Sequence, residues 1–598
     1  MNTKEKIIAA VFALGLVAWM FYSFKIDAPR RAEAARLAAE QAASVAATNT
    51  VSSVPAAIVA APEKAAPAET KAEATEHSAP EQTVVLSNDL VEVKLSTWGA
   101  VVRSVRLKGY NSRPGESSAE NPEMLLGADD RSALRMDGVP GLAAAADYKA
   151  ERQSDTVAVF TALGKNGLEL SRRVEILPDY KIVVRDTFRN KGKSALDLGA
   201  NTLDVGSLVR GESENDMLSV DSFSIAENEA VYWGTEKESQ NLLAAAAGGG
   251  FGCGSSSRTA AGMSEFTTLP IRSASRWVAV KNRFFVSAAM SDWDAEGFEF
   301  CARRDMNRNE YRLVELSARL QFAARQIAPG GECERVTSLF IGPKKLSALQ
   351  KFDADAKLDE VMEFGMWSWL CKLLVPTLNG FYAVVPNYGV AILLLTVLVR
   401  VLFWPLTHKS TQSMKKMSEI QPKIKELQEK FKDNPQKLQQ ETWAVYRDNK
   451  VNPMASCLPM LVQIPVFIAL FYVLRNSVEL RYAPFLWIAD LSEPENLLAG
   501  VLPIPLNILP ILMALTMGLQ SYFTPSAGDP KQQRMMMVMM PAMMLFMFYS
   551  FPSALSLYWT VSQVLAIVQM VMIRRKNKKD GDGTIEERPM TRQQRRHA

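Results

Sequence analysis

Apolar residues gather in six long runs, one near the start of the chain and five in its last third. The runs cover residues 7–24, 385–404, 457–474, 507–523, 536–551 and 554–573. About 20 residues at 1.5 Å each match the ~30 Å hydrocarbon core of a bilayer. The pattern therefore predicts a membrane protein with six spanning helices.

A period of two replaces these runs between residue 83 and about residue 345. Apolar and polar residues alternate there, and Gly, Asn, Asp and Pro separate the segments. The strand-like segments are residues 83–86, 90–95, 101–107, 180–188 and 277–280. Because such alternation is typical of half-buried strands, we expect one large antiparallel β-sandwich.

The segment between the first run and the β-sandwich is poor in large apolar residues. Residues 28–82 consist mainly of Ala, Pro, Glu, Lys, Ser and Thr, so they predict a linker without a core. The run before it, residues 7–24, is either a cleaved signal peptide or an anchor. It is longer than a usual signal core of roughly 7–15 residues and no small-x-small cleavage site ends it, which favours an anchor.

Lys and Arg residues lie on one side of the predicted membrane. In a six-span arrangement the N-terminus, residues 405–456, the loop with Lys531 and Arg534, and residues 574–598 all face the same compartment, and all carry basic residues. The positive-inside rule places that compartment in the cytoplasm. Both termini are therefore expected inside the cell, and the β-sandwich outside.

Two segments beside the second apolar run have helical patterns of their own. Residues 346–383 place Trp367 and Trp369 on an amphipathic stretch, which predicts helices at the membrane interface. Residues 405–456 repeat apolar residues at helical spacing and are interrupted at Asn434 and Pro435. We expect a helical hairpin there.

The chain supplies little for catalysis or metal binding. Its 68 Lys and Arg nearly balance its 64 Asp and Glu, and its three His are far apart in sequence. The five Cys match no zinc or CxxC spacing, and no nucleotide or nucleophile motif is present in its proper context. We therefore predict no enzyme, no metal and no cofactor. A Cys301–Cys333 disulfide and free buried thiols are both compatible with the sequence.

One full charge lies within the apolar runs. Arg400 is near the end of residues 385–404, and none of the six runs contains Asp or Glu. An arginine at the centre of a spanning helix costs roughly 2.5–3.5 kcal/mol, so this side chain either reaches the headgroups or lines a wet cavity. Thr396 lies one turn away, and Gln463, Tyr558 and Ser562 occupy other runs. Together these polar groups suit a water-filled groove in which the anion comes from a ligand.

Several motifs resemble those of the YidC/Oxa1/Alb3 membrane protein insertases. They are VRVLFWPLT at residues 399–407, the segment 414–424, KVNPM at 450–454, PMLVQIPVF at 459–467 and FPSALSLYW at 551–559. The first run, the linker and the β domain resemble the Gram-negative YidC form of this family. The resemblance covers nearly the whole chain.

The resemblance implies a protein that inserts and helps to fold integral inner-membrane proteins, alone or with the Sec translocon. Five core helices would form a positively charged groove in the inner leaflet, closed to the outside. Lipid burial of the client would drive insertion. The residues expected to line this substrate groove are Arg400, Thr396, Gln463, Tyr558, Trp559 and Ser562.

The resemblance also implies partners and a location. The expected partners are nascent membrane proteins, the Sec translocon with its accessory subunits, the lipid bilayer, and the ribosome or signal recognition particle through the basic tail. The expected location is the bacterial inner membrane, with the β domain in the periplasm. A transporter or channel is the main alternative, but it would need a path through the bilayer, and the sequence places charge on one side only. An intramembrane enzyme and an anchored sugar-binding protein fit less well, because the first needs a nucleophile–base pair and the second does not need six spans.

The fold class expected is a membrane α-helical protein with a five-helix insertase core and a large antiparallel periplasmic β-sandwich. The predicted segments are an N-terminal anchor (1–27), a low-complexity linker (28–82), the β-sandwich (83–345), interfacial helices (346–383), the five-span core (384–573) with a cytoplasmic hairpin (405–456), and a basic tail (574–598).

Overall fold

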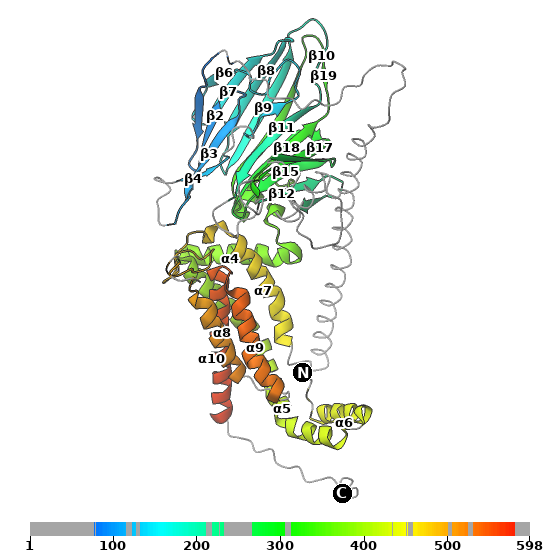
Figure 1. The fold of residues 1–598 in the computed structure, drawn as a ribbon, viewed down its shortest axis with the longest axis vertical. Helices are drawn as coiled ribbons and strands as arrows, with labels where there is room; N and C mark the ends of the chain where they lie inside the picture. The colour runs from blue at the N-terminus through cyan, green and yellow to red at the C-terminus, as the bar shows by residue number, and fades with distance from the viewer. Residues whose placement is uncertain are drawn as a thin grey trace. The chain divides into compact units, whose positions relative to one another are not determined.

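The computed structural model forms two compact units that meet in sequence at Met366 and Trp367. It describes residues 77, 79–114, 122–126, 132–210, 218–226, 228–232, 266–304, 313–432, 434–449, 451, 458–499, 501, 505–523 and 530–579. The first unit is a β domain and the second is helical (Figure 1). The predicted anchor, nearly all of the linker and the tail beyond residue 579 lie outside the described residues.

The largest sheet of the β domain has nine strands. Their order is β13 (Glu229–Tyr232), β12 (Ser219–Ser224), β15 (Ser275–Lys281), β16 (Phe285–Ala295), β20 (Glu332–Pro343), β9 (Lys181–Asn190), β8 (Leu168–Ile176), β7 (Val157–Leu163) and β6 (Lys149–Arg152). Along β8 every second residue is buried, which is the pattern of a strand with one face on a core.

The other sheets are smaller. A five-stranded sheet has the order β14 (Phe266–Ile271), β17 (Gly297–Arg304), β18 (Leu313–Phe322), β11 (Asn201–Val209) and β5 (Met136–Asp137). A four-stranded sheet contains β1 (Thr83–Ser87), β2 (Val91–Ser96), β3 (Val102–Asn111) and β4 (Pro122–Leu125), and β10 (Leu196–Asp197) pairs with β19 (Gln326–Ile327).

The five-stranded and nine-stranded sheets pack against each other. Strands β11 and β18 of the first contact β15 and β16 of the second, and every strand pair among the described residues is antiparallel. Large side chains such as Trp277, Phe188 and Phe340 are fully buried in this core. The predicted antiparallel β-sandwich is therefore confirmed.

A buried ion cluster lies within the sandwich. Asp186 accepts hydrogen bonds from Arg172, with Nε 2.6 Å and Nη2 3.1 Å from its oxygens, and from Arg335 Nη2 at 3.0 Å. These side chains are at most 1% exposed. Arg172 also donates to the carbonyls of Ala100 and Leu134. The cluster links β8, β9 and β20 through one carboxylate and two guanidinium groups.

A second buried cluster fixes the chain where it leaves the β domain. Lys281 of β15 donates to the carboxylates of Asp221 and Glu363 and, at 2.9 Å, to the carbonyl of Val361. Asp221 belongs to β12, whereas Val361 and Glu363 follow the last strand. The lysine therefore attaches the segment after the sandwich to the sheet.

The remaining elements are helices. They are α3 (Leu346–Phe352), η2 (Leu358–Met362), η3 (Gly365–Trp367), α4 (Ser368–Val384), α5 (Tyr388–Lys430), α6 (Pro435–Asp448), α7 (Leu458–Asn476), η5 (Val478–Leu480), α8 (Ile508–Phe523), α9 (Pro530–Phe548) and α10 (Ser553–Lys579). Two stretches, Tyr388–Lys430 and Ser553–Ile573, are long and apolar enough to cross a membrane by length and composition. Three shorter apolar helices, Leu461–Asn476, Ile508–Phe523 and Met537–Phe548, occupy the other runs.

Helix α5 does not end at Pro405, where the sequence placed the boundary between a span and a hairpin. It continues to Lys430, and α6 returns against it. Proline is tolerated within membrane helices because local adjustments satisfy the freed backbone groups. Met417, Ile420 and Ile424 form the small core of this hairpin with Val451. The predicted hairpin thus begins as a continuation of the preceding helix.

Two other sequence expectations concern side chains. In α4, Trp369 is exposed while Cys371 and Leu374 are buried, so the helix is amphipathic, but Trp367 before it is buried. Cys301 and Cys333 lie on strands of different sheets, β17 and β20, and no disulfide joins them. Of the two alternatives that the sequence left open, the disulfide between these two cysteines is therefore not formed. The glycine-rich run at residues 244–257 lies outside the described residues.

Candidate functional site

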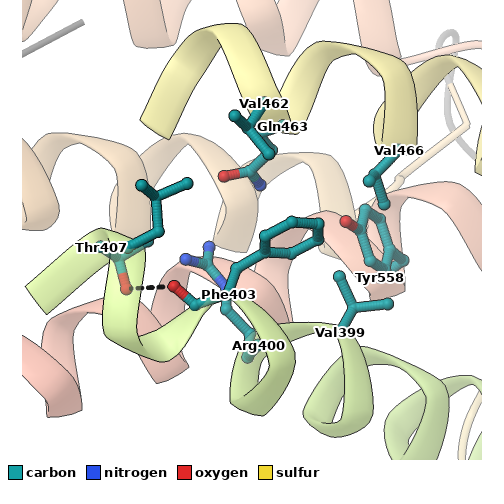
Figure 2. Close-up of a pocket in the computed structure, with 9 residues that line it drawn as sticks. Val399, Arg400, Phe403, Thr407, Val462, Gln463, Val466 and Tyr558 are labelled. Carbon is teal, nitrogen blue, oxygen red and sulfur yellow. Dashed lines mark hydrogen bonds between the residues drawn. The ribbon is translucent and has the colours of Figure 1, made fainter. Parts of the chain in front are cut away.

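A pocket lies where α5, α7 and α10 come together (Figure 2). It encloses about 360 Å³ of empty space, part of which is open to the surroundings. The lining residues are Val399, Arg400, Phe403, Leu406 and Thr407 of α5, Val462, Gln463 and Val466 of α7, and Tyr558 of α10. The α5 residues recur at intervals of three and four, so they lie on one helix face. The walls are mostly apolar, with a few polar groups.

Arg400 reaches across to α10. Its Nε and Nη2 donate to the hydroxyl of Ser562, at 2.9 Å and 2.6 Å from Oγ. No carboxylate among the described residues forms an ion pair with Arg400, in contrast to the arginines of the β domain. The side chain therefore points into the helical unit, and its described partner there is a neutral hydroxyl.

Two further polar side chains complete the site. Tyr558 of α10 is 1% exposed and, like Gln463 of α7, lines the pocket. Figure 2 shows the carboxamide of Gln463 and the guanidinium of Arg400 facing each other across the pocket. Polar side chains from three helices, those of Arg400, Gln463 and Tyr558, thus line one pocket, and Ser562 of α10 is hydrogen-bonded to Arg400.

Three residues predicted to line the groove are not among the lining residues of the pocket: Ser562, which contacts Arg400, and Thr396 and Trp559, which lie elsewhere. Thr396 is fully buried, and its hydroxyl donates to the carbonyl of Ile392 in its own helix at 2.6 Å. Trp559 packs edge-on against Phe467, with ring centroids 4.7 Å apart, and also against Phe548. Successive helix residues are turned by about 100°, so the residue after Tyr558 faces a different side of α10.

Most of the apolar lining of the pocket was not predicted from the sequence. Phe403 and Thr407 follow Arg400 by one and two turns, so helical spacing alone could have found them. Thr407 donates to the carbonyl of Phe403 at 3.1 Å and accepts from Nε2 of Gln569 at 2.8 Å. Gln569 of α10 therefore contacts the wall of the pocket at Thr407.

The described residues offer no metal site. No group of three or more His, Cys, Asp or Glu side chains in that part of the chain is arranged to hold a metal ion. The pocket itself contains a guanidinium, a carboxamide and hydroxyl groups, which are hydrogen-bonding groups for an anion or a peptide. These side chains can bind such a ligand through hydrogen bonds and one positive charge.

Family models match both units of the chain. The family described as 60Kd inner membrane protein matches residues 380–580, and the YidC periplasmic domain matches residues 83–376. A membrane protein insertase YidC of Chlorobaculum tepidum is 32% identical over 552 residues, which are 89% of this chain and 89% of that relative. Another, of Syntrophobacter fumaroxidans, is 43% identical over 306 residues, which are 50% of this chain and 53% of the relative.

A solved structure is also similar. The crystal structure of an active YidC insertase with its first transmembrane domain resolved matches 83% of this chain and 92% of its own, with 16% identity and a TM-score of 0.33. The family assignment rests on the sequence matches, because a named insertase aligns over nearly its whole length. The chain therefore belongs to the YidC family of membrane protein insertases, proteins of the inner membrane with a periplasmic domain.

Proposed function

We propose that the pocket between α5, α7 and α10 is the substrate site of this insertase. A short segment of an incoming membrane protein enters it, and Arg400 attracts the acidic residues of that segment. The observation that carries this proposal is the hydrogen bonding of Arg400, a full charge among apolar helices that is held by the neutral hydroxyl of Ser562. At an effective dielectric constant of about 20, a carboxylate about 4 Å away gains about 4 kcal/mol of Coulomb energy from such a charge, and removing both charges from water offsets much of this gain.

In this proposal the groove consists of Arg400, Gln463, Tyr558 and Ser562 and opens to the cytoplasm and the inner leaflet. A hydrophilic cavity lowers the cost of moving a polar segment out of bulk water, because buried polar groups need hydrogen-bond partners. The carboxamide of Gln463 and the hydroxyl of Tyr558, which line the pocket with Arg400, supply such partners. The client segment is thus stabilised by one charge and several neutral groups.

The hydrophobic part of the client leaves the pocket along α7 and α9. Apolar side chains on these helices are exposed, including Ile464 of α7 and Val538, Met539, Met543 and Phe546 of α9. Methionine is flexible and accommodates varied partners, which suits a surface that many clients pass. Transfer to lipid releases about 0.8 kcal/mol per buried CH₂, so insertion needs no nucleotide, and we propose no enzymatic step and no cofactor.

The same proposal includes six spans and two cytoplasmic termini. The α5–α6 hairpin and the basic residues 574–598 then lie on the cytoplasmic side. A basic tail suits RNA or anionic lipid, so the ribosome or the signal recognition particle is a proposed partner. The Sec translocon and its accessory subunits are proposed as further partners from the family resemblance.

Replacing Arg400 by Ala and by Lys tests the charge directly. The full chain is reconstituted in proteoliposomes with a client whose short translocated segment contains Asp, and insertion is measured by protease protection. We expect Arg400→Lys to retain most insertion and Arg400→Ala to lose on the order of tenfold, which corresponds to about 1.4 kcal/mol of lost attraction.

Arg475→Ala is a matched control, since it removes a cation from the last turn of α7 rather than from the pocket. This variant should insert the client like the unmodified protein. Equal insertion by all four proteins would exclude a role for the Arg400 charge.

A further inference from the structure

Two nitrogen atoms of Arg400 converge on one oxygen atom. Nε and Nη2 lie 2.9 Å and 2.6 Å from Oγ of Ser562, which is 3% exposed. These nitrogens form one edge of the planar guanidinium. A neutral acceptor therefore occupies one of the edges that a carboxylate could use.

The hydroxyl of Ser562 is itself held in place. A serine hydroxyl has two acceptor lone pairs and one donor hydrogen. Nε and Nη2 of Arg400 donate to these acceptor positions. Because Ser562 is buried within α10, it fixes the direction of the Arg400 side chain, whose guanidinium points into the pocket (Figure 2).

The other edge of the guanidinium stays available for a ligand. Within the described part of the chain, Nη1 of Arg400 makes no hydrogen bond, since both contacts of this side chain use Nε and Nη2. An arginine edge binds a carboxylate through two parallel N–H groups. Ser562 adds no charge, so the positive charge remains, whereas a carboxylate at this position would neutralise it before a client arrived.

We propose that Ser562 is the positioning residue that gives the pocket its preference for acidic client segments. It holds Arg400 by one edge, presents the other edge to a client carboxylate, and contributes no charge of its own. This inference rests on the proposed function, in which an acidic client segment enters the pocket.

The test compares two clients that differ only in the translocated segment, one with Asp and one with Asn at the same positions. Insertion into proteoliposomes is measured for the full chain and for Ser562→Asp, Ser562→Asn, Ser562→Ala and Ser562→Thr. Asn has the shape of Asp without its charge, so Ser562→Asn is the matched control for Ser562→Asp. The readout is the ratio of acidic to neutral client inserted, because a general folding defect lowers both clients and leaves the ratio unchanged.

We expect Ser562→Asp to reduce the ratio on the order of tenfold, the size typical of coupling between close charges, and Ser562→Asn to change it less than about twofold. If the Asp variant fails to fold, Ser562→Ala should still reduce the ratio by freeing Arg400, and Ser562→Thr should restore it. An unchanged ratio in Ser562→Asp, or an equal fall in Ser562→Asn, would overturn the inference.

Arg400→Ala in the same assay separates the two proposals. If Arg400→Ala reduces the ratio and Ser562→Asp does not, the role of Ser562 is wrong and the substrate site stands. If Arg400→Ala leaves the ratio unchanged, the proposed function fails, and the role of Ser562 fails with it.

Discussion

Asp186→Asn should strongly destabilise the β domain. Asp186 is the shared counter-ion of Arg172 and Arg335, and the three side chains are at most 1% exposed. The variant leaves two buried guanidinium groups without an anion. Removing one partner of a buried ion pair typically costs about 3–5 kcal/mol, since the remaining charge is uncompensated. This is a large part of the roughly 5–15 kcal/mol that stabilises a typical protein.

Thermal unfolding of the full chain in detergent measures this change, with far-ultraviolet circular dichroism following the sheet signal. For a domain of this size, about 1 kcal/mol shifts the melting temperature by roughly 2–4 °C, so we expect a fall on the order of 10 °C. Glu334→Gln is the control, because its ion pair with Arg185 is about half exposed, at 48% and 50%. An exposed pair contributes little. A fall of less than about 2 °C in Asp186→Asn would refute the reasoning.

The pH dependence of the stability of the β domain is a second test of the role of Asp186. Burial by itself raises the pKa of this carboxyl, but Arg172 and Arg335 together hold the pKa below its ordinary value. A carboxyl with a folded pKa below its unfolded pKa contributes stability above the unfolded value, and that contribution is lost as pH falls through the folded value. The native chain should lose stability in acid below about pH 4, and Asp186→Asn should lose less over that range.

Two other predictions concern the second buried cluster and the helical unit. Burial raises the pKa of Asp221 to about 7 despite its ion pair with Lys281, so the folded state binds more protons than the unfolded state and stability falls as pH rises from about 4 to 7. Asp221→Asn should reduce the change of melting temperature with pH over this range. An unchanged pH dependence would contradict the raised pKa of Asp221. In the helical unit, a Cβ at Gly389 would lie 2.1 Å from the ring of Phe485. Gly389→Ala should therefore lower the melting temperature, and adding Phe485→Leu should restore part of it; a double variant no more stable than Gly389→Ala would refute the clash.

Sequence patterns identified the architecture because each element has a characteristic period. Strand alternation marked the sandwich, and apolar runs marked α5 and α7 to α10. The buried clusters left no such signal. Arg172, Asp186 and Arg335 are brought together only by the pairing of β8 with β9 and of β9 with β20, and the last two residues are 149 positions apart. Their contact depends on which strands pair and in which register, and alternation along a strand does not determine either.

The polar part of the pocket was predictable, and its apolar part was not. Arg400 and Ser562 stand out because they are polar residues in apolar runs. Phe403 does not, because apolar residues like it occur throughout a spanning helix. Thr396 shares a face with Arg400, but a threonine in a helix can satisfy its hydroxyl on the preceding turn, as this one does. Trp559 was expected in the groove from the resemblance, and in the structure its ring packs against Phe467.

The most direct test of the central claim is a reciprocal exchange of charge. Insertion into proteoliposomes is measured for the full chain and for Arg400→Glu, each with clients whose translocated segment contains either Asp or Lys. The account predicts that the native chain prefers the acidic client and that Arg400→Glu prefers the basic one. If Arg400→Glu reduced the insertion of both clients equally, or still inserted the acidic client better, attraction between this side chain and the client would not be the basis of recognition.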